Sequence, residues 1–164
     1  MNYRQGPKGA LMDEYEKAIK ELGMLLARVP AQLLTTIIDP DTSDDNCRSI
    51  QHILSHVVHA GYGYATSIHN HVHTQPVQRP DKTLRNTLSA YLQDLEHMLA
   101  YTDNVLETIN EHQLEASGDM PRIQAAWGQR YDIEQMMEHA IVHILRHRRQ
   151  LEKILEQQPA RNQQ

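Results

Sequence analysis

The chain has 164 residues, enough to bury a sizeable core, and we expect a single domain over residues 1–164. Its net charge of −5 provides no broad basic surface for nucleic acid, and its one cysteine excludes a disulfide within the chain. The sequence has no stretch of about 20 apolar residues and no secretory signal pattern, so we expect a soluble cytoplasmic protein that does not bind membranes.

Apolar residues at steps of three and four predict two helices in the first half of the chain. The first is predicted over residues 9–38, with an interruption or bend at Pro30. A polar, turn-forming stretch follows, and the second helix is predicted over 46–73. Gly61 and Gly63 lie inside it, where each costs up to about 1 kcal/mol relative to alanine. They mark a local irregularity or admit close approach of another backbone.

The second half of the chain has the same helical periodicity. Helices are predicted over 83–113 and 130–158, and two prolines within 75–82 separate the third from the second. The longest connection, 115–129, holds the only tryptophan, Trp127, which we expect to pack over the end of the helices; a place in a pocket wall is the alternative. The polar C-terminal tail is expected to fray. Four long helices predict an all-α fold, a four-helix bundle.

Histidines form a stripe on one face of two predicted helices. The second and fourth helices each carry three, at spacings of three or four residues: His52, His56 and His59, and His139, His143 and His147. These spacings keep the side chains on one helix face. The apolar stripe of the fourth helix passes through position 147, so His147 points inward. Imidazoles that converge from two packed helices can bind a zinc-like ion, and three of them leave the open position typical of a catalytic site.

Spacing alone leaves more than one set of ligands open. His139 with His143 has the same separation as His143 with His147, and His52 is as well placed as His56. Other kinds of metal site are excluded because their sequence motifs are absent. The chain lacks the Glu-x-x-His pairs of a di-iron centre, the His-Glu-x-x-His of a zincin and the Cys-x-x-Cys-His of a c-type haem.

The segment HILRHRRQ resembles the last helix of the DinB/YfiT-like metalloenzyme family. In that family a His-x-x-x-His pair is followed by Arg, a small residue and Gln. The matching residues here are His143, His147, Arg148 and Gln150. Arg149 stands where the family commonly has glycine. The segment ILSHVV is similar to the family's ligand segment in the second helix and aligns His56 with the third ligand.

This resemblance implies a divalent metal, most often nickel or zinc, bound by His56, His143 and His147. It also implies up-down-down-up helix order in the bundle, and a homodimer. With that order, the link at 75–82 must run nearly extended along the bundle. Some members of the family use low-molecular-weight thiols, so such a thiol is a candidate cofactor.

We therefore expect a metal-dependent enzyme for a small-molecule substrate, either a thiol-dependent S-transferase or a hydrolase. The alternative is a non-catalytic metal-binding or stress-associated bundle. Three neutral imidazoles leave the ion its full charge, so a bound water or thiol would lose its proton near neutral pH. Many family members place a carboxylate within a turn of the ligand matched by His56, but this chain has none between His56 and His73. His59 and His139 are the candidate catalytic bases instead, and Tyr62 is a candidate hydroxyl donor.

Overall fold

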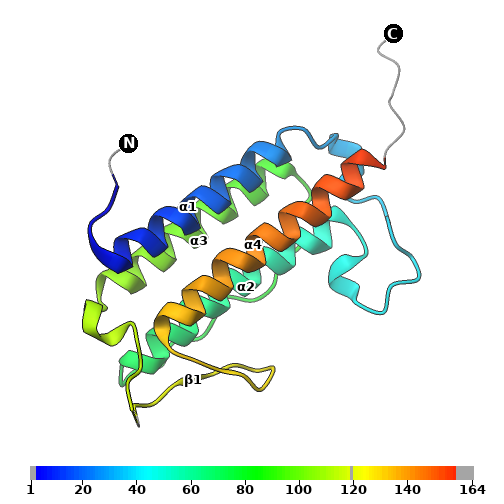
Figure 1. Ribbon diagram of the computed structural model, residues 1–164. Coiled ribbons are helices and arrows are strands. Elements are labelled where there is room, and N and C mark those ends of the chain that lie inside the picture. The colour runs from blue at the N-terminus through cyan, green and yellow to red at the C-terminus, as the bar shows by residue number, and fades with distance from the viewer. Residues whose placement is uncertain (1–2, 119, 158–164) are drawn as a thin grey trace.

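The computed structural model describes residues 3–118 and 120–157 (Figure 1). Within them lie four α-helices: α1 (Gly6–Leu26), α2 (Ile50–Val72), α3 (Leu88–Glu107) and α4 (Ile133–Glu156). Three 3₁₀ turns and a short hairpin occupy the connections: η1 (Ala31–Leu33), η2 (Asp45–Cys47), η3 (Glu111–Gln113), β1 (Ile123–Gln124) and β2 (Arg130–Tyr131). The predicted all-α four-helix bundle is confirmed. The predicted helix end at residue 158 and the polar tail lie outside the described residues.

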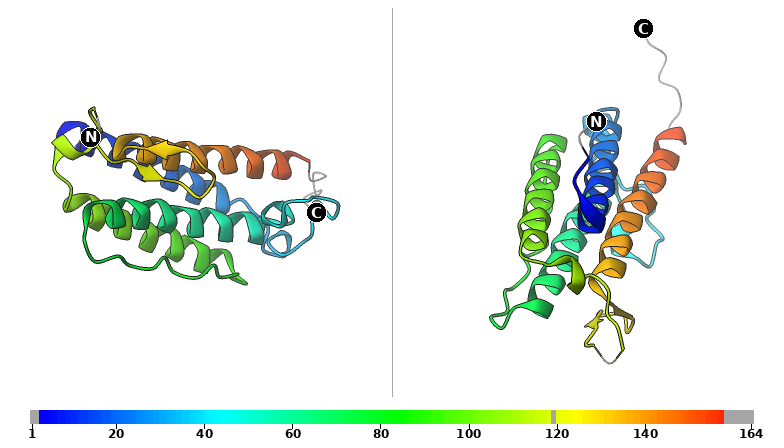
Figure 2. Two further views of the ribbon diagram at one scale, coloured as in Figure 1. Left: turned by 90° about the horizontal axis from the view of Figure 1, so that it is seen from below. Right: turned by 60° about the vertical axis from the view of Figure 1, so that its left-hand side comes forward.

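The helices follow the up-down-down-up order (Figures 1 and 2). α1 and α4 run side by side in one direction, while α2 and α3 run in the other, and α2 packs against both α3 and α4. Because α2 and α3 are parallel, the link between them returns along the whole bundle (Figure 2). As this order requires, the link contains no helix between residues 73 and 87. None of the helices in the described part of the chain is long and apolar enough to cross a membrane.

Side chains of α2 hold the link against the bundle. The Asn70 amide pairs with the backbone of Val77: Nδ2 donates to the carbonyl oxygen at 3.0 Å, and Oδ1 accepts from the N–H at 2.8 Å. Further along, Ser55 Oγ donates to the Thr83 carbonyl oxygen at 2.8 Å. An extended segment without a strand partner needs other groups to satisfy its backbone. α2 supplies such groups at Val77 and Thr83, and these contacts fix the path of the link beside that helix.

The first helix is shorter than predicted. It ends at Leu26, and residues up to 38 form turns and a single 3₁₀ helix. Pro30 has no amide proton and adopts an extended conformation with ψ of 133°, so the α-helix cannot continue through it. Leu33 and Leu34, which continue the apolar pattern, are buried as the chain turns across the end of the bundle. Their apolar character therefore reflects burial in a turn, and it does not indicate that the helix continues.

The other three helices begin later than predicted because capping side chains set their starts. The caps are the Ser49 hydroxyl, which accepts from His52 N–H at 3.2 Å, the Thr87 hydroxyl, which accepts from Ala90 N–H at 3.2 Å, and the Asp132 carboxylate, which accepts from Gln135 N–H at 2.9 Å. α3 also ends at Glu107, short of the predicted residue 113, and residues 111–113 form the separate turn η3.

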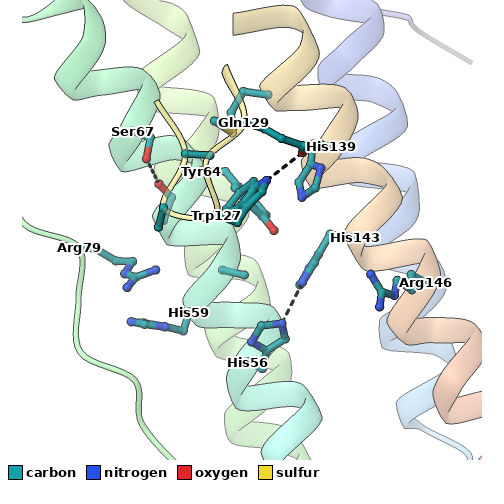
Figure 3. Close-up of a pocket in the computed structure, with 15 residues that line it drawn as sticks. His56, His59, Tyr64, Ser67, Arg79, Trp127, Gln129, His139, His143 and Arg146 are labelled. Atoms are coloured by element: carbon teal, nitrogen blue, oxygen red, sulfur yellow. Dashed lines mark hydrogen bonds between the residues drawn. The ribbon is translucent and has the colours of Figure 1, made fainter. Parts of the chain in front are cut away.

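The hairpin before α4 was not predicted. Its two strands have two residues each, with Ile123 opposite Tyr131 and Gln124 opposite Arg130, too short to show an alternating pattern. Gly128 allows the reversal, with φ of 93° and an N–H that donates to the Ala125 carbonyl at 3.0 Å. The hairpin places Trp127 beside α2 and α4 (Figure 3).

Gly61 lies at a close contact between α2 and α3. α2 runs through both glycines without a break, so neither marks an irregularity. A Cβ atom at Gly61 would lie 2.1 Å from Met98 Sδ and 3.0 Å from Tyr15 Oη. The close approach is therefore made by side chains, not by another backbone. Met98 and Tyr15 are almost completely buried here, which makes the contact part of the core.

We expect Gly61→Ala to lower the free energy of unfolding by about 1–3 kcal/mol, because the added methyl group overpacks this contact. Gly23→Ala is the matched control, since its Cβ would meet only Leu92 Cδ2 at an ordinary 3.4 Å. The control should be neutral or more stable by up to about 1 kcal/mol, from its better helix propensity. Urea unfolding measures both. A Gly61→Ala protein as stable as the parent would contradict the close α2–α3 packing.

Candidate metal centre

Three of the predicted histidines converge from two helices. His56 of α2 and His143 and His147 of α4 each offer a ring nitrogen, and the three atoms lie within 4.8 Å of one another. The Nε2 atoms of His56 and His143 face each other at 3.0 Å (Figure 3). An ion 2.0 to 2.1 Å from each nitrogen would set two ligands roughly 2.8–3.4 Å apart, for angles between 90° and tetrahedral. His56 and His143 already have this spacing.

Gln150 orients the most buried of these imidazoles. His147 is 7% exposed, and its Nδ1 lies 2.9 Å from Gln150 Oε1. An amide oxygen only accepts hydrogen bonds, so Nδ1 carries the proton and Nε2 keeps its lone pair. Metal-binding histidines characteristically donate their other N–H to such a partner. The neighbouring Arg148 forms an ion pair with Glu21, which ties α4 to α1.

Burial keeps these imidazoles neutral. It is the largest cause that lowers the pKa of His56 to about 4 and of His143 to about 3, and repulsion from a charged His147 is the next. Burial likewise lowers the pKa of His147. A metal ion binds the neutral form of imidazole. At neutral pH all three rings are therefore in the form that an ion can bind.

One carboxylate, Asp44 in the loop before α2, acts electrostatically on this cluster. Its Oδ1 accepts a hydrogen bond from the Asn46 N–H at 2.9 Å, the main reason that its pKa is lowered. Its negative charge raises the pKa of His56 and His147, against the larger effect of burial. Sequence reasoning missed this residue, because nothing in a turn-forming stretch indicates that the loop folds back toward the histidines.

A pocket of about 570 Å³ opens beside His56 and His143 (Figure 3). Four segments surround it, namely α2, the α2–α3 link, the hairpin and α4. The polar or aromatic lining residues are His56, His59, Tyr64, Ser67, Arg79, Trp127, Gln129, His139, His143 and Arg146. His147 does not line the pocket, so it joins the cluster from the side away from the pocket. The volume is within the range of small-molecule sites. An ion bound by the three histidines would thus border a substrate-sized space.

The two candidate bases, His59 and His139, both line this pocket. His59 lies beside Arg79 on the side of the link (Figure 3). His139 stacks on Trp127, with ring centroids 5.1 Å apart and an interplanar angle of 22°. Trp127 therefore lies in the pocket wall, not over the end of the bundle. Burial is the main cause that lowers the pKa of both histidines, which favours the neutral, proton-accepting form. Their catalytic role stays a prediction.

The structure does not place Tyr62 among the residues that line the pocket. Its ring packs on Tyr101 of α3 at a centroid distance of 5.3 Å. Six residues along a helix turn a side chain by about 240°, which carries Tyr62 away from the face of His56. Eight residues turn it by only about 80°, and Tyr64 accordingly lies in the pocket, 5.6 Å from the His143 ring. Helical geometry was the signal that could have identified Tyr64.

The rival ligand sets do not assemble. His52 Nδ1 lies 2.8 Å from the Ser49 hydroxyl at the start of α2. His139 lies one turn along α4, with its ring centroid 6.5 Å from that of His143. Among the described residues, His56, His143 and His147 are the only group of three potential ligands gathered closely enough for one ion.

Without metal, the free energy of unfolding should fall as the pH drops from 7 to 5. The unfolded chain binds protons at histidines near the usual pKa of 6.5, whereas folded His143 resists protonation down to about 3. For the partly exposed cluster we expect a loss of about 1 kcal/mol per pH unit. Urea unfolding at several pH values tests this, with His143→Gln as the comparison. The same pH dependence in both proteins would contradict the burial of a neutral imidazole.

Comparisons with known proteins agree with this architecture. Among solved structures the chain is similar to the crystal structure of a conserved protein from Enterococcus faecalis, with 16% identity and a TM-score of 0.65 over 92% of this chain and 96% of that one. At this identity the likeness shows the fold alone. A comparison with curated proteins found no match. Residues 14–158 match the model of the DinB family, and because the match covers most of the sequence, the chain belongs to the DinB family.

Proposed function

We propose that this protein is a metal-dependent enzyme that acts on a small molecule. The main support is that the nitrogens of His56, His143 and His147 converge at the wall of a pocket of about 570 Å³. Imidazole ligands without thiolates or carboxylates suit nickel and zinc, which we propose as the ions. A structural zinc site is normally closed by four protein ligands. Three ligands beside an open pocket support a catalytic site over a purely structural one.

When bound, an ion with three neutral ligands lowers the pKa of a water or thiol at its free position. In this proposal His59 and His139 take up the proton, and their position in the pocket wall and their lowered pKa values support that role. Burial raises the pKa of Tyr64 to about 12, so its hydroxyl remains a hydrogen-bond donor for a substrate oxygen. These groups suit a hydrolase and a thiol-dependent S-transferase equally. The two enzymes differ only in the nucleophile, which is water in a hydrolase and a thiol in an S-transferase.

His56→Ala, His143→Ala and His147→Ala should each abolish stoichiometric metal binding. Gln150→Leu should retain the site but weaken metal affinity about 10- to 100-fold, because His147 loses the acceptor that orients it. His52→Ala is the matched control and should bind like the parent. Untagged protein, supplied separately with zinc and nickel and analysed for metal, gives the result. Parent protein that retains no metal would contradict the proposal.

His59→Gln and His139→Gln separate an enzyme from a non-catalytic metal-binding bundle. In an enzyme, at least one of them should lower kcat about 10²-fold or more while metal content stays near one equivalent. Nitrophenyl esters test hydrolysis, and a chlorodinitrobenzene with low-molecular-weight thiols tests S-transfer. Tyr62→Phe, outside the pocket wall, is the control and should keep the parental rate. Metal-loaded protein inactive in both screens would favour the non-catalytic alternative.

A further inference from the structure

The pocket contains two guanidinium groups and no carboxylate. Arg79 of the α2–α3 link and Arg146 of α4 lie on opposite sides of it (Figure 3). Within residues 3–118 and 120–157, neither arginine has an ion-pair partner. Arg85, by contrast, binds Asp94 through two nitrogens at 2.8 and 3.0 Å. Both side chains are exposed and, in the described part of the chain, unpaired, so their charges are available to an anion that enters the pocket.

The charge of this wall is opposite to that of the whole chain. The protein carries a net charge of −5, yet the charged residues that line the pocket are both positive, before any metal is counted. Both charges act inside the pocket, because Arg79 and Arg146 each oppose the burial that raises the pKa of Tyr64 in its wall. A concave site lined by one sign of charge concentrates ligands of the other sign. The electrostatics therefore favour an anion.

Arg79 is held in a defined place. Two residues before it, Val77 makes both of its backbone hydrogen bonds with Asn70 of α2. Opposite the side chain is Gly63, where a Cβ atom would lie 2.7 Å from Arg79 Nη1 and 3.2 Å from its Cδ. Because Gly63 has no side chain, the arginine occupies the space that a Cβ atom at this position would fill. The link and α2 together therefore place this guanidinium at the pocket wall.

An apolar surface lies in the same pocket. Trp127 and Tyr64 meet edge to face, with ring centroids 6.2 Å apart, and both line the space. We propose that the pocket binds a small molecule with a carboxylate or phosphate group on a planar or apolar body, and that Arg79 selects the anionic group. The inference deepens the proposed function, because it assigns a substrate class to the same site. A guanidinium offers paired N–H donors that match the oxygens of either group.

Binding of benzoate, phenyl phosphate and neutral benzamide to the metal-loaded full chain tests this inference. Trp127 is the only tryptophan, so its fluorescence reports binding in the pocket. Benzoate or phenyl phosphate should bind about tenfold more tightly than benzamide, as expected for charge-assisted hydrogen bonds. Whichever of the two binds more tightly identifies the kind of anion. Arg79→Gln should remove most of that preference and leave benzamide binding and metal content unchanged.

Arg149→Gln is the matched control, because it removes the same charge from α4 outside this pocket and should keep the preference. Gly63→Ala should weaken anion binding with Arg79 still present, since the methyl group takes the guanidinium's place. An anion preference that survives Arg79→Gln would overturn the inference, because the metal alone would then account for it. Failure of either anion to bind at millimolar concentration would overturn it too.

The same samples separate this inference from the proposed function. Protein that retains metal but lacks Arg79-dependent anion binding would refute the inference and leave the metal enzyme proposal intact. Protein that retains no metal but still binds benzoate or phenyl phosphate through Arg79 would refute the metal enzyme proposal and support the anion site.

Discussion

The antiparallel contact between α2 and α4 is the constraint on which the site depends. It brings His56 against His143 and His147, buries the three rings in part and so favours their neutral form, which is the form that a metal ion binds. Protonating an imidazole at this interface costs free energy, because burial disfavours the charged ring. The cluster is therefore uncharged at neutral pH, and a bound ion would bring in the positive charge. Gln150 orients the His147 ring, because its side-chain carbonyl accepts from Nδ1 and leaves Nε2 without a proton. The pH dependence of stability and the proposed metal binding therefore depend on the same three rings.

The parallel pair α2 and α3 has a second consequence for the pocket. Two parallel neighbours need a connection as long as the bundle, and here that connection lies along α2, pinned by side chains such as Asn70 and Ser55. It carries Arg79 to the pocket, while the hairpin before α4 carries Trp127 to another wall. The helices thus supply the ligands, whereas the two connections supply a charge and an aromatic surface. If the proposed function holds, a change in either connection would alter the ligand preference of the pocket without disturbing the three candidate metal ligands.

Much of the architecture could be predicted because it follows from local patterns. Apolar periodicity identified four helices, and the spacing of the histidines identified a candidate metal-binding face. The helix ends were less accurate, since they depend on capping side chains such as Ser49 and Asp132 rather than on periodicity. The prediction of Tyr62 ignored the angle between side chains on a helix, and Tyr64 was not considered. Asp44 was missed because its approach to the cluster depends on how the loop before α2 folds back.

By itself, the sequence determined the helical class, the positions of the histidine stripes and, through HILRHRRQ, the family. These properties follow from residues a few positions apart on one helix. Spacing left His52 and His56 open and the family resemblance favoured His56, but only the tertiary structure showed that His56 meets His143. It also brought Arg79, His139 and Trp127 into one pocket. Those relations join segments far apart in the chain. Their distances depend on helix direction, on the path of the link and on the fold of the hairpin, and helical periodicity specifies none of the three.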